Sequence, residues 1–131
     1  MVKTEIKAQR ELTHIDLNYV ITQKDFTFAL CEFVDEFKRS NNKYEMIKYP
    51  PTAKSETKEN ICILAAVVHK LANDYNLSVP EWVNAPLYKM PYPIFAHNTI
   101  NIEYQEFLIK DSPAEFADKN IFYGSRAIER V

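Results

Sequence analysis

The strongest helical pattern lies in the middle of the chain, at about residues 56–75. Seven apolar residues repeat there at i, i+3 and i+4 spacing: Ile61, Leu64, Ala65, Val68, Leu71, Ala72 and Tyr75. Cys62, Ile63 and Val67 widen this stripe, so little of the helix can face water. The sequence therefore predicts a central buried helix, with Ser55 as its N-cap and Asn76 as a left-handed cap at its end.

A second helix is predicted from about Thr22 to Ser40. Its apolar face consists of Phe26, Ala29, Leu30, Phe33 and Phe37. Thr22 and Asp25 form a weak capping box at its start, and the polar run 40–42 ends it. Residues 43–57 read as a polar connection, because Pro50 and Pro51 force extended backbone.

The first 21 residues show a different pattern. Ile15, Leu17, Tyr19 and Ile21 alternate with polar neighbours, which is typical of a short strand or an extended arm. We therefore predict an N-terminal arm or strand at residues 1–21 and a single helical domain at 22–131.

Prolines divide the C-terminal half into short elements. Pro80 begins a short helix that carries Trp82, and the proline-rich segment 85–95 is too apolar to be a free linker. Asn98 or Thr99 starts a helix to Lys110, and Ser112 with Pro113 starts another that ends at Asn120. The inward residues expected on the first of these two helices are Ile100, Tyr104, Phe107 and Leu108. Residues 121–123 are extended, and Ser125 caps a last turn at 126–131.

These elements predict a mainly α fold. It is a small irregular helical bundle around the central helix, with short extended segments at the N-terminus and near residues 121–123. A chain of 131 residues fits one domain.

The glycine content excludes the main nucleotide-binding and hydrolase fingerprints. Gly124 is the only glycine, whereas average usage predicts roughly nine. Phosphate-binding loops and the nucleophile elbow of hydrolases each need several glycines at fixed spacing. We therefore expect no enzyme activity, no catalytic residue and no cofactor.

The charge pattern gives no sign of a polyanion-binding arm. Sixteen basic and eighteen acidic residues leave a net charge of −2, spread evenly along the chain. The longest apolar run, Ile61 to Val68, is far shorter than the ~20 residues of a membrane span. The polar N-terminus lacks a signal-peptide core, and Cys31 and Cys62 read as buried free thiols. We expect a cytoplasmic protein that does not bind membranes.

Histidines and carboxylates show no catalytic or metal-binding spacing. His14, His69 and His97 form no His–His or His–Cys ligand pattern, so no metal site is predicted. Acidic pairs lie opposite the apolar stripes, where solvated charge is the usual state.

Two features suggest nucleic-acid binding as an alternative function. Lys38, Arg39, Lys43 and Lys48 form a small basic cluster, opposed by Glu45. Residues 64–85 resemble a helix-turn-helix, although its second helix exposes Glu81 and Asn84 and no basic residue. A DNA-binding regulator is therefore the alternative, and nucleic acid is not the favoured partner.

Aromatic residues close to rigid prolines are good anchors for a protein partner, because docking them costs little entropy. The candidates in this chain are Trp82, Tyr92, Phe95, Phe122 and Tyr123.

The C-terminal 60 residues carry a series of short motifs. These are Pro80-Glu-Trp82, Pro91-x-Pro93-x-Phe95, Ser112-Pro113-x-x-Phe116 and Asn120-Ile121-Phe122. The series resembles a segment of small bacterial antitoxin-like or accessory proteins, which are encoded beside a minimal nucleotidyltransferase-type toxin. Ala117-Asp118-Lys119 stands where that family usually has arginines. The resemblance implies the antitoxin-like member of a two-gene system, which binds a protein partner; the oligomeric state is not determined.

Overall fold

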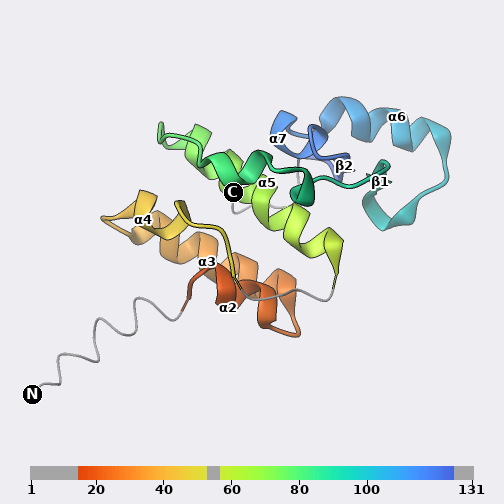
Figure 1. Ribbon diagram of the computed structural model, residues 1–131. Helices are drawn as coiled ribbons and strands as arrows, with labels where there is room; N and C mark the ends of the chain where they lie inside the picture. Colours follow the sequence, from red (N-terminus) through yellow and green to blue (C-terminus); the bar gives the residue numbers. More distant parts are fainter. Residues whose placement is uncertain (1–14, 53–56, 126–131) are drawn as a thin grey trace, which may run out of the picture.

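The computed structural model describes residues 15–52 and 57–125 (Figure 1). In chain order, its elements are α2 (Leu17–Thr22), α3 (Phe26–Arg39), α4 (Lys43–Ile47), α5 (Lys58–Asp74), the 3-10 helices η1 (Glu81–Asn84) and η2 (Pro86–Tyr88), β1 (Ile94–Phe95), the 3-10 helix η3 (Ala96–Asn98), α6 (Ile102–Asp111), α7 (Ala114–Ala117) and β2 (Ile121–Phe122). The predicted mainly α fold is confirmed.

Helix α5 is the centre of the structure. Figure 1 shows it between α2, α3 and α4 on one side and η1, η2, α7 and β2 on the other. Every side chain from Cys62 to Val68 is buried, as are Leu71 and Ala72. The predicted central helix is therefore confirmed, because neighbours cover it all round.

The ends of α5 are fixed by local chemistry. The Thr57 hydroxyl oxygen accepts a hydrogen bond from the N–H of Asn60 at 3.2 Å, so Thr57 is the N-cap. The predicted N-cap, Ser55, lies outside the described residues. Asn76 has a φ of 59°, which confirms the left-handed residue expected after the helix.

Helix α3 presents the predicted apolar face to α5. Ala29, Leu30, Phe33 and Phe37 are buried. The helix begins at Phe26 rather than near Thr22, because the Asp25 carboxylate accepts from the N–H of Phe28 and so acts as the N-cap.

The connection after α3 contains a helix that the sequence did not predict. Helix α4 is one turn long, and its Ile47 side chain is fully buried. The carbonyl oxygen of Ile47 accepts a hydrogen bond from Trp82 Nε1 at 3.0 Å. A residue 35 positions away thus holds this turn, which local spacing cannot reveal.

The prediction of an N-terminal arm or strand is wrong for residues 17–21. They lie in helix α2 instead of a strand or extended arm. Asp16 caps it through the N–H of Tyr19, and Leu17, Val20 and Ile21 are buried at helical spacing. Residues 1–14 lie outside the described part of the chain.

The proline-rich segment 85–95 packs against the rest of the described structure, as predicted. Tyr88 and Met90 are buried, and the N–H of Met90 donates to the carbonyl oxygen of Lys119. Parallel strands β1 and β2 then pair Ile94 with Ile121 and Phe95 with Phe122. This confirms the extended segment expected near residues 121–123.

Helix α6 lies at the rim of the structure and packs against β2 (Figure 1). Of the four side chains predicted to point inward, Leu108 is buried, whereas Ile100, Tyr104 and Phe107 are exposed. The prediction for those three is wrong, because no other described element covers the outer side of α6. The predicted turn at 126–131 lies outside the described residues.

Candidate functional site

An apolar surface lies on helix α6 and the residues just before it. Ile100, Ile102, Phe107 and Ile109 are 90%, 68%, 55% and 50% exposed, and Tyr104 is exposed beside them. Exposed apolar side chains that neighbour one another mark binding surfaces more often than isolated ones do. We call these five residues the α6 face.

The α6 face has two flanks. Ile102 and Ile109 are seven residues apart, which brings both to one side of a helix with 3.6 residues per turn. Tyr104 and Phe107 lie on the other side, with their rings stacked at 6.2 Å and 9°.

A charged ridge separates these flanks. The helical spacing places Glu103, Glu106 and Lys110 along it, and all three side chains are exposed. None of the three forms a hydrogen bond or ion pair with another residue in the described ranges 15–52 and 57–125. The part of the chain that the structure describes thus leaves these three charges exposed to solvent.

The N-terminal end of α6 is held by side-chain capping. Asn101 Oδ1 accepts a hydrogen bond from the N–H of Tyr104 at 2.8 Å. Gln105 Nε2 donates to the carbonyl oxygen of Thr99 at 2.9 Å. These bonds fix the first turn of the helix.

The C-terminal end is held by the turn at residues 124–125. The N–H of Gly124 donates to Ser112 Oγ, and the N–H of Ser125 donates to Asp111 Oδ2, both at 2.9 Å. Gly124 has a φ of 87°, and a Cβ there would lie 3.2 Å from Leu108 Cδ2. Helix α6 is thus anchored at both ends while its outer surface stays uncovered by the described elements.

The sequence-predicted partner residues are not gathered on this face. Trp82 is half-buried, donates to Ile47 and packs edge-on against Tyr88 at 5.1 Å. Phe95 and Phe122 stack at 5.5 Å across the two strands and are also half-buried. These three side chains pack against other residues of the same chain and so contribute to the fold.

The other two predicted partner residues differ from each other. The hydroxyl of half-buried Tyr123 donates to Glu59 Oε2, and burial, together with that carboxylate, raises the pKa of Tyr123. Tyr92 is 63% exposed and is the member of the predicted set that faces solvent.

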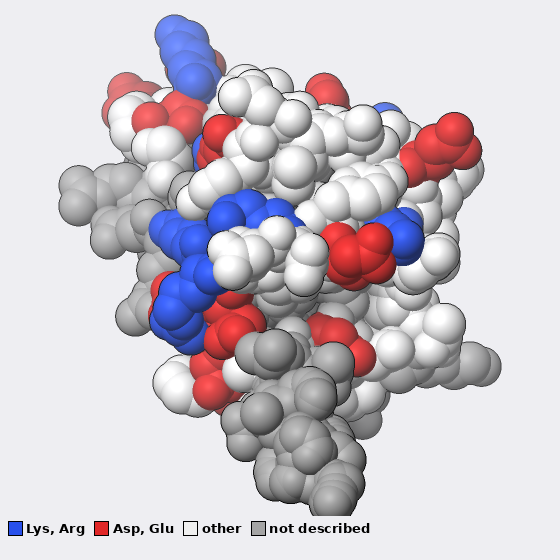
Figure 2. All heavy atoms as spheres, turned by 90° about the vertical axis from the view of Figure 1, so that its left-hand side faces the viewer, with Lys and Arg blue, Asp and Glu red and all other residues white. Residues whose placement is uncertain are grey.

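The predicted basic cluster lies around the end of α3 and along α4. Figure 2 shows lysine and arginine side chains in a band on this face, with acidic side chains beside them. Arg39 pairs with Glu36 and Lys48 pairs with Glu45, each at 2.9 Å. Such pairing reduces the positive field that a phosphate backbone would meet.

The remaining members of that cluster are Lys38 and Lys43. Lys43 Nζ donates to the carbonyl oxygen of Ser40 at 2.8 Å and lies 5.4 Å from the centre of the Tyr75 ring. Lys38 is exposed in the last turn of α3, close to the helix C-terminus, where a cation is stabilised by the helix dipole.

The segment 64–85 does not form a helix-turn-helix. Helix α5 ends at Asp74, and the second element, η1, is a 3-10 helix of four residues. Ala85 and then Pro86 follow, and the proline prevents a longer helix. DNA binding itself stays a prediction, but this segment offers no recognition helix for it.

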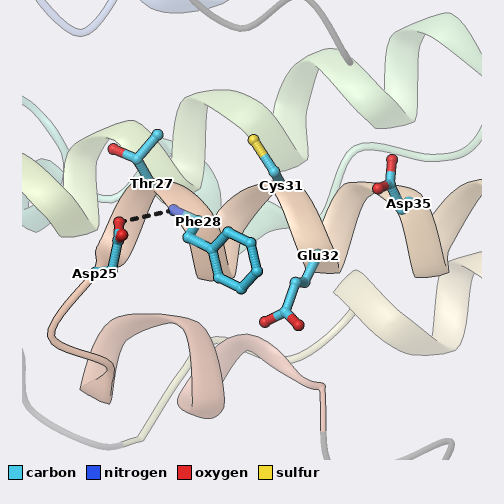
Figure 3. A pocket seen from close by; sticks show the side chains of 6 residues that line it. All are labelled: Asp25, Thr27, Phe28, Cys31, Glu32 and Asp35. Carbon is cyan, nitrogen blue, oxygen red and sulfur yellow. Dashed lines mark hydrogen bonds between the residues drawn. The ribbon is translucent and has the colours of Figure 1, made fainter.

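A shallow hollow of about 430 Å³ follows one side of α3 (Figure 3). Its lining residues all come from that helix and its cap: Asp25, Thr27, Phe28, Cys31, Glu32 and Asp35. The Asp25 carboxylate caps the helix, and Glu32 accepts from the Tyr19 hydroxyl at 3.0 Å. Figure 3 shows Glu32 and Asp35 pointing in different directions, so the two carboxylates do not converge on one substrate atom.

The cysteines and histidines do not gather into a reactive centre. Cys31 and Cys62 are free, as predicted, but Cys31 is half-exposed in the hollow and only Cys62 is buried. His69 is half-buried and His97 is exposed, whereas His14 lies outside the described residues. Within residues 15–52 and 57–125, no group of histidine, cysteine and acidic side chains has metal-binding geometry. No helix in these ranges is both long and apolar enough for a membrane span.

The C-terminal motifs quoted for the resemblance to the antitoxin-like family lie in η1, β1, α7 and β2 and the residues next to them. Phe116 is buried, and Lys119, which stands where that family usually has arginine, is buried too. Lys119 Nζ donates to the carbonyl oxygen of Val83, and burial lowers the pKa of the amine. No protein-family model, curated protein or solved structure matches this chain.

Proposed function

We propose that this chain is a non-catalytic protein-binding module and that it docks through the α6 face. The observation that carries the proposal is the exposure of five large apolar side chains on and just before one short, anchored helix. Covering such side chains is strongly favourable, at about 1.5–3 kcal/mol for an isoleucine that becomes fully buried.

The rigidity of α6 supports the same function. Capping at Asn101 and the bonds from Ser125 and Gly124 hold the helix in one position before a partner arrives. A surface that is already ordered loses little conformational entropy on binding. The α6 face therefore suits a helix or groove that offers complementary apolar side chains.

The finer proposal is that the partner comes from a bacterial two-gene system in the cytoplasm, with this chain as its antitoxin-like member. Its support is the resemblance of the motifs between Pro80 and Phe122. The proposal implies that the gene for the partner lies next to the gene for this chain.

The test is capture of the partner from a lysate of the native host, followed by reconstitution from purified components. Wild type is compared with the double variant Ile102→Ser/Ile109→Ser, and with Phe28→Ser as the control. Phe28 is an equally exposed aromatic residue on α3, 63% exposed. We expect the double variant to weaken binding of the purified partner by at least ~10-fold and the control to bind normally.

Capture of the same partner with equal affinity by all three proteins would refute docking through the α6 face. Failure to bind any protein that can be reconstituted would refute the protein-binding function itself.

A further inference from the structure

We propose that one flank of the α6 face, Ile102 and Ile109, binds a second copy of this chain together with the charged ridge beside it, with the two α6 helices antiparallel about a two-fold axis near Glu106. This inference rests on the proposed protein-binding function, and it gives the α6 face an occupant other than the product of a neighbouring gene. Its basis is the spacing of two residue pairs on α6, one apolar and one charged.

The apolar pair is self-complementary. In a two-fold dimer, a contact from residue i to residue j is repeated from j to i. Ile102 and Ile109 lie on one flank, about 10 Å apart along the helix. An antiparallel copy therefore places Ile102 against Ile109 of the partner twice, which covers the flank that the described part of the chain leaves bare.

The charged pair has the same spacing. Glu103 and Lys110 are also seven residues apart and lie beside the isoleucine flank on the ridge. The antiparallel arrangement brings each Glu103 to a Lys110 of the other copy. A parallel arrangement would instead bring glutamate to glutamate and lysine to lysine, so charge complementarity selects the antiparallel pair.

Glu106 limits the strength of this dimer. It lies between the two pairs, so near the axis it faces its own copy, and the two carboxylates repel each other. Helix α6 has ten residues and is only about 15 Å long, which gives an interface smaller than the standard ~800 Å² per partner. The expected assembly is a weak, reversible dimer.

Glu106 also separates this inference from binding to another protein. A foreign helix that carries basic residues would gain from Glu106 as well as from Glu103. In the dimer, only Glu103 makes an attractive contact with the other copy, because Glu106 faces Glu106. Glu106→Gln is therefore expected to tighten the dimer and to weaken docking of a basic helix.

The first experiment measures the mass of the full chain by sedimentation equilibrium at loading concentrations from about 5 to about 500 μM. We expect the mean mass of the wild type to rise toward that of a dimer. Ile109→Ser is expected to stay monomeric, and Phe28→Ser, with its change on α3, to behave as the wild type. Circular dichroism confirms that each variant is folded.

The second experiment reverses the charges. Glu103→Lys and Lys110→Glu should each weaken dimerisation by about 10-fold, because each change replaces attraction by repulsion at two symmetric positions. Mixing the two variants should restore it. In the mixed dimer, one copy carries only basic side chains at these two positions and the other copy only acidic ones, so both contacts are attractive again.

A wild type that stays monomeric across this range overturns the inference, as does a mixture that associates no better than either charge variant alone. Tighter association of Glu106→Gln supports it, and weaker association counts against it. If the wild type is monomeric while Ile102→Ser/Ile109→Ser still loses a reconstituted protein partner, the dimer is refuted and the proposed protein-binding function stands.

Discussion

Helices α5 and α6 are both rich in large apolar residues, but most of these side chains are buried on α5 and exposed on α6. On α5, every residue from Cys62 to Val68 is buried. On α6, Leu108 is buried while Ile102, Phe107 and Ile109 remain at least half exposed. The spacing of apolar residues therefore shows which side chains would be stabilised by burial. It does not show whether other elements of the same chain bury them.

The neighbours of the two helices explain the difference. Helices α2 and α7 and the 3-10 helices η1 and η2 pack around α5, whereas α6 packs against β2 and the turn after it. The elements around α5 form a closed core, whereas α6 lies at the rim with its outer side left exposed by the other described elements. Four substitutions test this contrast, and they follow in order of decreasing expected effect.

Leu64→Ala is expected to have the largest effect. Leu64 is fully buried on α5, so the substitution leaves a cavity and should lower the free energy of unfolding by about 3 kcal/mol. Urea denaturation measures this change. Ile102→Ala on α6 is the matched comparison, with an expected change within about 0.5 kcal/mol. Equal losses from the two variants would show that the α6 face is buried within the chain.

Gly124→Ala should have the next largest effect. Its φ of 87° disfavours a side chain, and the added Cβ would lie 3.2 Å from Leu108 Cδ2 and 3.3 Å from Asp111 Oδ2. We expect the free energy of unfolding to fall by about 1–2 kcal/mol. Relative to the wild type, amide hydrogen exchange should become faster in α6 and change less in α5. Ser125→Ala is the comparison: it removes the hydrogen bond from Ser125 Oγ to Asp111 Oδ2 at 3.0 Å but adds no side chain at the positive φ of Gly124. Unchanged exchange in α6 would mean that this turn does not anchor the helix.

Tyr123→Phe removes the hydrogen bond from the Tyr123 hydroxyl to Glu59 and should cost about 1 kcal/mol at neutral pH. The pKa of Tyr123 is raised above its usual 10.0 by burial and by Glu59. Its contribution to stability is therefore complete below pH 10 and is lost as the pH rises further, because the unfolded chain ionises first.

The measurement is the difference in unfolding free energy between wild type and Tyr123→Phe as a function of pH. We expect the difference to be constant up to about pH 9 and to shrink in more alkaline solution. Tyr92→Phe, at an exposed tyrosine, is the control and should give no such trend. A difference that stays constant through the alkaline range would contradict the assigned environment of Tyr123.

Ile109→Ser should have the smallest effect on stability. The side chain is 50% exposed, so its replacement should change the free energy of unfolding by less than about 0.5 kcal/mol. Thermal unfolding of the dilute protein measures this change. A loss comparable to that of Gly124→Ala would show that Ile109 supports the fold rather than a binding surface.

The sequence predicts the long helices well because their burial is encoded locally. Phe33 and Phe37 on α3, and Leu64 and Leu71 on α5, repeat at helical spacing over several turns, and both helices form where they are expected. The two short helices α2 and α4 are missed, because one or two turns contain too few residues for a clear periodic pattern. Helix α4 depends on the distant contact between Ile47 and Trp82.

The same limit explains why the α6 face was missed. Ile100, Tyr104 and Phe107 fit an inward stripe with Leu108. Spacing alone cannot tell that, of these four, only Leu108 is buried, beside Gly124. A signal was nevertheless present, because Ile102 and Ile109 put apolar residues on other sides of the same short helix. A helix that is apolar on several sides needs cover on several sides.

The left-handed residues of this chain have a consequence for its stability. Asn76, His97, Asn98 and Asn120 all have positive φ, although glycine adopts that conformation with less strain. Each side chain strains the folded backbone but also removes many conformations that a glycine would sample after unfolding. Glycine in place of Asn76 would therefore relieve strain in the folded turn but increase the conformational entropy of the unfolded chain. Because these two effects oppose each other, replacing Asn76 by glycine should change the free energy of unfolding little.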